Sequence, residues 1–383
     1  MRYAIVTETY PPEINGVALT VEGLEHGLRQ RGHDVEVVRP RQAPGQAPRP
    51  HELLVRGAGI PRYPGMRFGL PAGRQLRRHW SQQRPDALYI ATEGPLGDSA
   101  LRVALRLGIP VSTGFHTRFD TYMRDYGLGW LQPLALAWMR RFHNRSDATL
   151  VPTCELADFL KAQRFDSAVH LPRAVDTTRF EPGKRSDALR ADWGVAADGL
   201  AVIYLGRIAP EKNLPLAVRA FRALQARRLD ARFVWVGEGP SLPAIRDANP
   251  DFVFCGTQRD DVLARHFASA DLFLFPSHSE TFGNVTIEAM ASGVATVAFR
   301  YGAAREHLRD GRNGASIDGR DEDAFVAAAC RLAIDDDIRQ AMGLRAREAV
   351  HKLRPAQVAA DFDDILRRII ANRSFGHARP ALA

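Results

Sequence analysis

The chain has 383 residues, enough for about two to three domains and for more than one hydrophobic core. Its hydrophobic content of 45% and charged content of 25% are ordinary for a globular protein, and no apolar run approaches the roughly 18 residues that a membrane span needs. The net charge is +8, but the basic residues are spread along the chain without a nucleic-acid-binding signature, so we expect no nucleic acid partner.

The first part of the chain alternates short β-branched segments with longer amphipathic ones. Strands are expected at 2–7, 34–38, 52–55, 86–90, 110–114, 147–151 and 168–171. Helices are expected at 17–31, 73–83, 96–107, 130–143 and 153–163. Residues 39–73 are rich in proline, glycine and arginine, and they predict a long loop around the strand at 52–55.

The stretch PRAVDTTRFEPGKRSD at 172–187 interrupts this rhythm and is the expected linker. Strands then follow at 201–205, 232–236, 252–254, 271–275 and 294–298. Helices are expected at 213–228, 241–247, 260–268, 284–292, 322–333, 338–351 and 356–371. The alternation predicts two α/β units, each with a parallel, doubly wound sheet.

The N-terminus and the cysteines bear on where the protein works. The segment MRYAIVTETYPP has no basic region and no cleavage site, so we expect no signal peptide. Cys154, Cys255 and Cys330 are odd in number and lack C-x-x-C spacing, which argues against a disulfide framework or a zinc site. Both observations favour the cytoplasm.

Polar residues follow several of the expected strands, at the sheet edge where ligands bind in open α/β folds. Asn15 and Gly16 open a helix whose amides can hold an anion, or they form only a turn and a cap. His116 follows another strand as a general base or as a structural imidazole. Arg207 and Lys212 follow a third, where they can grip a diphosphate or stand as solvated surface charges.

The segment SETFGNVTIE places two acids around a turn after the apolar run LFLFP. Gly283 and Asn284 let the chain turn and expose the first amides of the next helix, which can hold an anion. Glu280 and Glu288 can then bind hydroxyl groups at either end of that anion, as a nucleotide sugar requires. The alternative is that Glu280 is an acid near a cap and Glu288 a surface acid.

Two acidic pairs, Asp321 with Asp323 and Asp361 with Asp363, have the D-x-D spacing of some metal sites. They lie in helical, polar sequence and are expected to form solvated faces or caps, so we predict no metal and no other cofactor.

Several motifs together resemble the retaining glycosyltransferases of family 4. In the second half these are GRIAPEKNL, VGEGP, FCGTQRDD and SETFGNVTIEAMASGVATVA, which contains the E-x7-E signature from Glu280 to Glu288. In the first half they are ETYPPEINGVALTV, ATEGPLGDSALRVA and FHTRFDTYM, the last similar to lipid-directed mannosyl-, glucosyl- and sulfoquinovosyltransferases. The resemblance covers essentially the whole chain.

The resemblance implies the α/β fold called GT-B, in which two Rossmann-like domains face each other across a cleft. Because the last helix of that fold crosses back, it implies an N-terminal acceptor domain of residues 1–172 plus about 355–383, and a nucleotide-sugar domain of residues 173–354. It also implies metal-independent transfer of a hexose, with retention, from a donor of the GDP-mannose or UDP-glucose type to a glycan or lipid.

The resemblance also assigns roles to individual residues. Arg207 and Lys212 would hold the diphosphate, Glu280 the donor sugar, and Glu288 the ribose, while His116 would lie near the reacting carbon. The remaining donor contacts would come from Asn15, Gly16, Gly237, Gly256, Thr257, Gly283, Asn284 and Val285. The chain departs from the family pattern at Tyr301-Gly302-Ala303-Ala304, where a double glycine is common, and at Arg173-Ala174-Val175-Asp176, where N-G-V-D is usual.

A second hypothesis concerns the inner face of the cell membrane. Trp130, Leu134 and Trp138 form one helical stripe that Arg140 and Arg141 follow, and the segment RQLRRHW places Arg74, Arg77 and Arg78 beside Trp80. Together they can dock on anionic lipid, although tryptophans are more often core residues.

Other protein classes fit the sequence less well. A nucleotide-sugar 2-epimerase shares the fold, and a non-enzymatic nucleotide-sugar binding protein would share the site. An NAD oxidoreductase predicts a G-x-G-x-x-G fingerprint that the sequence lacks.

Overall fold

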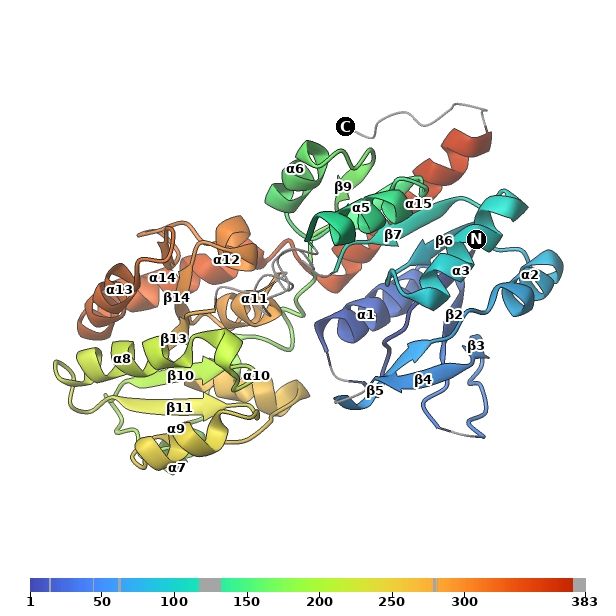
Figure 1. Cartoon of the computed structure of the whole chain (residues 1–383). Coiled ribbons are helices and arrows are strands. Elements are labelled where there is room, and N and C mark those ends of the chain that lie inside the picture. The colour runs from blue at the N-terminus through green and yellow to red at the C-terminus, as the bar shows by residue number, and fades with distance from the viewer. Residues whose placement is uncertain are drawn as a thin grey trace. The chain divides into compact units, whose positions relative to one another are not determined.

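The computed structural model describes residues 1–374 apart from residues 14, 44, 61–62, 117–131, 278–279 and 281. The chain forms two compact units (Figure 1). Unit 1 comprises Met1–Ala174 and Pro355–Ala383, and unit 2 comprises Val175–Arg354.

Unit 1 is built on a parallel sheet of seven strands in the order β3-β2-β1-β6-β7-β8-β9. The strands are β1 (Arg2–Val6), β2 (Asp34–Pro40), β3 (Glu52–Val55), β6 (Ala87–Ile90), β7 (Val111–Gly114), β8 (Ala148–Val151) and β9 (Ala168–His170). The helices are α1 (Gly16–Gln30), α2 (Gly73–Gln82), α3 (Pro95–Leu107), α5 (Gln132–His143), α6 (Cys154–Ala162) and α15 (Pro355–Ser374).

Two cores lie on opposite faces of this sheet, because successive side chains of a strand point to opposite sides. Tyr3 and Ile5 of β1 pack with α1 and α15 on one face. Ala4 and Val6 pack with α2 and α3 on the other. The strands are therefore apolar on both faces, which is why they appear in the sequence as short continuous apolar runs.

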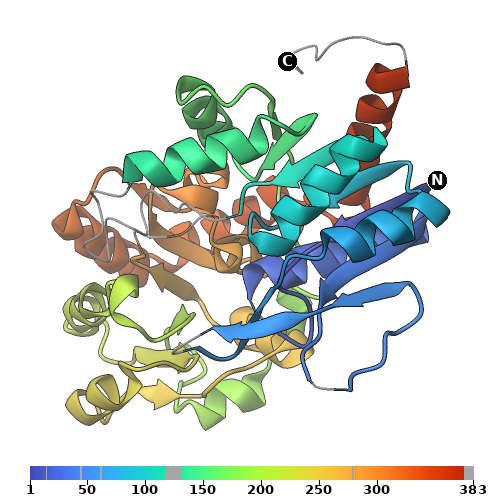
Figure 2. The ribbon, with the colours of Figure 1, turned by 45° about the vertical axis from the view of Figure 1, so that its right-hand side comes forward.

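The C-terminal helix returns to unit 1, as the family resemblance implied. Figure 2 shows α15, in red, running alongside the blue and teal elements of unit 1. It packs closely on α1, since a Cβ added to Gly27 would lie 2.4 Å from the Cβ of Ala359. Asp363 of α15 is fully buried and accepts a hydrogen bond from the Tyr3 hydroxyl at 2.8 Å, so the prediction that Asp363 belongs to a solvated face is wrong. The helical pattern of 356–371 could not predict that Asp363 is buried, because the residues that bond its carboxylate, Tyr3 and Arg31, are more than 300 positions away in the sequence.

The predicted loop at 39–73 is also partly wrong. Strands β4 (Gly57–Ile60) and β5 (Tyr63–Gly69) pair in an antiparallel, two-stranded sheet of their own. Glycine and proline are depleted in strands, and so the composition predicted a loop. A two-stranded sheet consists of edge strands only, and these tolerate a proline that a central strand excludes.

Unit 2 is built on a parallel sheet of six strands in the order β12-β11-β10-β13-β14-β15. The strands are β10 (Ala201–Leu205), β11 (Arg232–Val236), β12 (Val253–Phe254), β13 (Leu272–Phe275), β14 (Ala295–Phe299) and β15 (Ala315–Ile317). The helices are α7 (Asp187–Asp192), α8 (Leu214–Gln225), α9 (Leu242–Ala248), α10 (Asp260–Ser269), α11 (Asn284–Ala291), α12 (Gly302–His307), α13 (Glu322–Ile334) and α14 (Asp336–Val350). Asp321 accepts from the amide of Ala324 and so caps α13, as expected of an acid at a helix start.

In both sheets the order of the strands reverses at the first strand, so that later strands are added on its other side. β1 lies between β2 and β6, and β10 lies between β11 and β13. In open α/β sheets the carboxyl edge beside such a switch point is where ligands bind. The candidate site residues follow β10, β11, β12 and β13 in unit 2, and β1 and β7 in unit 1.

Candidate functional site

Lys212 and Glu280 form an ion pair in unit 2, although they are 68 residues apart in sequence. Lys212 ends a 3-10 helix, Pro210–Lys212, after β10, and Glu280 follows the adjacent strand β13. The Oγ of Ser277 donates a second hydrogen bond to Glu280 Oε1 at 2.9 Å. The two charged side chains are only 16% and 19% exposed, so the pair is more strongly coupled than one on the open surface.

Helix α11 begins beside this pair without a side-chain cap. Gly283 precedes it with φ +86°, a left-handed conformation that favours glycine. The amide of Thr286 bonds to the carbonyl of Gly283 at 3.0 Å, whereas among the described residues no acceptor is present for the amides of Asn284 and Val285. The positive end of the helix is thus open to an anion.

Glu288 lies in the second turn of α11 and is half-buried. Burial raises the pKa of its carboxyl from 4.5 to about 7, while Arg179 opposes the rise. No hydrogen-bond donor contacts this carboxyl within the part of the chain that the structure describes. Glu288 is therefore not the exposed surface acid of the alternative reading, and its carboxyl is available to a ligand.

Arg207 also follows β10, but its ion pair is with Glu211 and not with Glu280. Its side chain is 55% exposed, and its guanidinium lies 3.3 Å from a carboxylate oxygen of Glu211. The sequence predicts that Arg207 and Lys212 hold a diphosphate together. For that, the Arg207 guanidinium must leave Glu211 and bind the diphosphate instead.

Glycine backbones form the remainder of the carboxyl edge of β10 and β11. The amide of Gly237 bonds to the carbonyl of Gly256 at 2.8 Å, and that of Gly206 bonds to Val236 at 3.1 Å. Gly237 has φ +141°, and a Cβ there would lie 2.0 Å from the carbonyl oxygen of Gly206. Only glycine allows this approach. Thr257, which follows β12 at the same edge of the sheet, is exposed.

His116 lies in unit 1, two residues after β7, and is 9% exposed. Its Nε2 is 2.7 Å from the hydroxyl of Tyr89, and its Nδ1 is 2.6 Å from the guanidinium of Arg173. Sequence reasoning missed both partners. The departure from N-G-V-D at Arg173 was the available signal, but nothing in the sequence connected it with a histidine 57 residues earlier.

Asn15 caps α1 with its side chain. Its Oδ1 accepts from the amides of Val17 at 3.1 Å and Ala18 at 2.9 Å, and its Nδ2 donates to Thr9 Oγ1 at 2.6 Å. The turn-and-cap alternative for Asn15 is therefore confirmed, and Gly16 stands exposed as the first helical residue.

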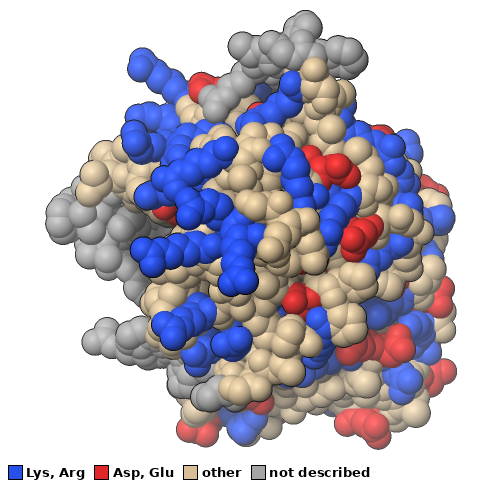
Figure 3. Space-filling view, turned by 90° about the vertical axis from the view of Figure 1, so that its right-hand side faces the viewer, with Lys and Arg blue, Asp and Glu red and all other residues tan. Residues whose placement is uncertain are grey.

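The residues predicted to dock on lipid divide into two groups. Trp80 is 1% exposed and donates to Glu36 at 3.3 Å, so it is a core residue, whereas Leu134 and Trp138 of α5 are 69% and 50% exposed. Trp130 lies outside the described residues. Helix α2, which carries the exposed Arg74, Arg77 and Arg78, lies on the side of Figure 1 that faces the viewer in Figure 3, where basic side chains gather. Within the described ranges, no helix combines the length and hydrophobicity that crossing a bilayer takes.

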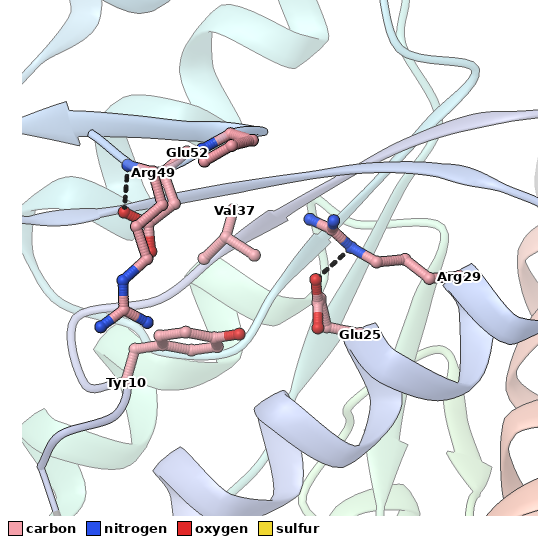
Figure 4. Close-up of a pocket in the computed structure, with 7 residues that line it drawn as sticks. Tyr10, Glu25, Arg29, Val37, Arg49 and Glu52 are labelled. Carbon is pink, nitrogen blue, oxygen red and sulfur yellow. Dashed lines mark hydrogen bonds and ion pairs between the residues drawn. The ribbon is translucent and has the colours of Figure 1, made fainter.

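A cavity of about 310 Å³ in unit 1 lies between α1 and the loop before β3. Figure 4 shows Tyr10 and Arg49 on one side and Glu25 with Arg29 on the other. Its carboxylates are already neutralised, since Glu25 pairs with Arg29, and the Glu52 carboxylate pairs with a buried arginine, Arg39. We assign it no ligand.

Comparisons with known proteins follow the same division of the chain. A model described as Glycosyltransferase Family 4 matches residues 14–179, and one described as Glycosyl transferases group 1 matches residues 199–335. A GDP-mannose-dependent alpha-mannosyltransferase of Mycolicibacterium smegmatis is 34% identical over 358 residues, which cover 91% of this chain and 92% of that protein.

Two further similarities extend the comparison. A GDP-mannose-dependent alpha-(1-6)-phosphatidylinositol monomannoside mannosyltransferase of Mycolicibacterium smegmatis is 30% identical over 366 residues, which cover 90% of this chain and 92% of that protein. Among solved structures, a sucrose-phosphate synthase from Thermosynechococcus elongatus has a TM-score of 0.79 at 18% identity, over 97% of this chain and 99% of that one. At this identity the structural likeness speaks for the fold alone.

Proposed function

The chain belongs to glycosyltransferase family 4, has the GT-B fold and uses a nucleotide sugar, and from that premise we propose that it transfers mannose from GDP-mannose to a glycan or lipid acceptor. We further propose that the transfer retains the anomeric configuration and needs no metal ion. The choice of mannose over glucose follows the curated relatives, whose names specify GDP-mannose.

The observation that carries this proposal is the arrangement at the carboxyl edge of the sheet in unit 2. Three groups lie at or near that edge: the cation of Lys212, the start of α11 at Asn284, which has no side-chain cap, and the carboxyl of Glu288 inside α11, which no hydrogen-bond donor contacts among the described residues. A diphosphate satisfies the first two groups, and hydroxyl groups of a ribose satisfy the third.

The ion pair of Lys212 and Glu280 holds both side chains in position before the donor arrives. In the proposed complex Lys212 turns to the diphosphate, and Glu280 accepts hydrogen bonds from hydroxyls of the sugar. Negative charge grows on the departing diphosphate in the transition state, and a preorganised cation with helix amides lowers the barrier there. Lys212 and the α11 amides thereby supply the charge stabilisation that a metal ion supplies in other transferases.

The acceptor is proposed to be lipid-linked, because one of the relatives is named for a phosphatidylinositol mannoside. Leu134 and Trp138 expose apolar surface on α5, and α2 exposes Arg74, Arg77 and Arg78. Apolar and cationic groups of this kind bind anionic bilayers together. Flotation with phosphatidylglycerol vesicles tests this contact: binding that Trp138→Ala weakens supports it, and flotation no better than with phosphatidylcholine removes it.

Release of nucleoside diphosphate from GDP-mannose, UDP-glucose and ADP-glucose, with and without lipid or glycan acceptors and in the presence of EDTA, tests the donor, acceptor and metal proposals together. NMR of the anomeric proton of the product tests retention. We expect acceptor-dependent release of GDP that EDTA does not reduce. Conversion of donor without any acceptor would instead indicate an epimerase or hydrolase.

A matched pair of variants tests the site itself. Lys184 also forms an ion pair in unit 2, with Asp261 at 2.6 Å, and neither residue is among the predicted donor contacts. Lys212→Ala is expected to abolish stabilisation of the protein by GDP in a thermal-shift assay, and Lys184→Ala to leave it intact. Equal responses to GDP in both variants would remove Lys212 from the donor site.

A further inference from the structure

Three side chains from three separate elements meet in unit 1. Tyr89 is on β6, His116 follows β7, and Arg173 follows β9; they are 2%, 9% and 8% exposed. Both ring nitrogens of His116 are engaged, Nε2 with the Tyr89 hydroxyl at 2.7 Å and Nδ1 with the Arg173 guanidinium at 2.6 Å. A buried hydrogen-bond network whose polar groups all have partners is rigid, so the three side chains are held in one arrangement.

The chemistry of arginine decides where the proton of the imidazole lies. A guanidinium carries only donors and does not lose its proton in proteins. Arg173 therefore donates to Nδ1, and Nδ1 must offer its lone pair. A neutral imidazole then carries its single proton on Nε2, which donates to the oxygen of Tyr89.

The end of β7 is shaped for this contact. A Cβ on Gly114 would lie 2.4 Å from His116 Nε2 and 2.4 Å from the Tyr89 hydroxyl oxygen. Any other residue would push the ring and the phenol apart. Tyr89 is held in turn by Phe362 of α15, whose ring centroid is 5.1 Å away in an edge-on arrangement.

We propose that Arg173 and Tyr89 are positioning residues that hold His116 in one orientation and in the single tautomer with the proton on Nε2. The inference rests on the proposed function together with the role that the family resemblance implies for His116, near the reacting carbon of the donor sugar. It refines that function, because a ring whose Nδ1 lone pair is bound to a cation does not take the proton of the acceptor. His116 then serves as a neutral contact of fixed geometry, and the base in the reaction is another group.

The charges around His116 support the same assignment. Burial, Arg173 and His143 all lower the pKa of His116 well below its ordinary value. Within the described part of the chain, the charged or titratable groups that face the cluster are Arg173, Tyr89, His143 and Glu93. Glu93 lies 3.3 Å from Nε2 of His143. Burial raises the pKa of the Tyr89 phenol, so this hydroxyl stays protonated at physiological pH.

NMR of the full-length protein labelled with 15N-histidine tests the assignment without any assay of activity. The His116 signals are identified from their loss in His116→Gln. We expect Nδ1 to resonate as an unprotonated nitrogen and Nε2 as a protonated one, with no titration between pH 5.5 and 8. A protonated Nδ1, or titration near the ordinary pKa of about 6.5, overturns the proposal.

Variants separate positioning from simple structural support. Arg173→Met is expected to let His116 titrate and populate both tautomers, and Arg173→Lys to restore the fixed tautomer, because it returns one donor. Tyr3→Phe is the matched control for Tyr89→Phe, since it also removes a buried hydroxyl from unit 1, here the one bonded to Asp363 at 2.8 Å. A His116 spectrum that changes equally in Tyr3→Phe and Tyr89→Phe contradicts the proposal.

Steady-state kinetics then tests the underlying function separately. With the tautomer shift in hand, Arg173→Met is expected to lower kcat roughly 10- to 100-fold with little change in the KM for the donor, and Arg173→Lys to recover most of it. If the NMR result holds but kcat does not change, the positioning is real and the placement of His116 at the donor sugar is wrong.

Discussion

The His116 cluster of unit 1 and the carboxyl edge of unit 2 differ in how far their polar groups are hydrogen-bonded within the protein. In unit 1 both ring nitrogens of His116 are bonded to groups of the same unit. In unit 2 the carboxyl of Glu288 has no donor among the described residues, and α11 starts without a side-chain cap. The first is complete without a ligand, whereas the second has polar groups that a ligand must satisfy.

The difference is visible in protonation as well. Burial drives His116 to its uncharged form, which suits a group that is already fully bonded. Burial also drives Glu288 toward its uncharged form, but with a pKa of about 7 it lies close to ionisation at physiological pH. A donor that brings hydroxyl groups to Glu288 stabilises the carboxylate, so binding and deprotonation are coupled.

The largest effect that we expect comes from breaking the unit 2 edge at its cation. Lys212→Ala should lower kcat about 10²- to 10³-fold, the usual cost of losing one group that stabilises transition-state charge. Measurement of GDP release under saturating donor checks this, with Lys184→Ala as the control. A loss below threefold would show that Lys212 only pairs with Glu280.

Glu288→Gln should separate stability from function. Because the folded-state pKa is raised, the folded state holds a proton that the unfolded state has lost, so stability falls as pH rises from about 4.5 through 7. The variant should therefore unfold with a free energy about 1–3 kcal/mol higher at pH 8 and unchanged below pH 4.5, while donor affinity falls. Denaturant unfolding at both pH values checks the sign. A variant that is destabilised at pH 8 would mark Glu288 as a structural residue.

Gly114→Ala breaks the unit 1 cluster sterically. The added Cβ should cost roughly 1–3 kcal/mol of stability and separate His116 from Tyr89. Thermal unfolding and GDP titration check the comparison, because GDP affinity, which we assign to unit 2, should be retained. Gly23→Ala on α1 is the control, since nothing lies within 4 Å of its added Cβ. Loss of GDP binding in Gly114→Ala alone would show that the two sites depend on each other.

The smallest effect should follow Asn15→Ala. Loss of the cap of α1 should cost about 1 kcal/mol, as should Thr153→Ala at α6, where the hydroxyl accepts from Leu156 at 3.1 Å. The KM for the donor should change by less than about twofold, because the Asn15 side chain is occupied by Thr9, Val17 and Ala18. A tenfold rise in KM for Asn15→Ala alone would place this side chain on the donor.

Much of the fold follows from sequence pattern, because the strands are apolar on both faces and stand out as short runs. AVIYL at 201–205 corresponds to β10 residue for residue. The pattern fails for the three-residue strand β15 and the six-residue helices α7 and α12, which are too short to show a period. It fails also for β4 and β5, whose composition is that of a turn.

The site, like the fold, has features that the sequence predicts and contacts that it does not. The spacing of Glu280 and Glu288 around a glycine turn predicts a helix start with acids before and within it, and the structure has that arrangement. Contacts between distant segments were not predictable from spacing. The pairing of Lys212 with Glu280 depends on β10 and β13 being neighbours, and the pairing of Arg173 with His116 depends on how the chain leaves β9.

The return of α15 to unit 1 has a consequence for biosynthesis. The hydroxyl of Tyr3 and the carboxylate of Asp363 are bonded across 360 residues, so β1 cannot complete this contact until α15 has been synthesised. Until then, the apolar surface of α1 that Phe362 and Leu366 cover is open, whereas unit 2 is continuous and can fold as soon as it is made. The later-synthesised unit is therefore the first to be finished, and a chain that terminates before residue 355 offers chaperones an incomplete unit 1 beside a complete unit 2.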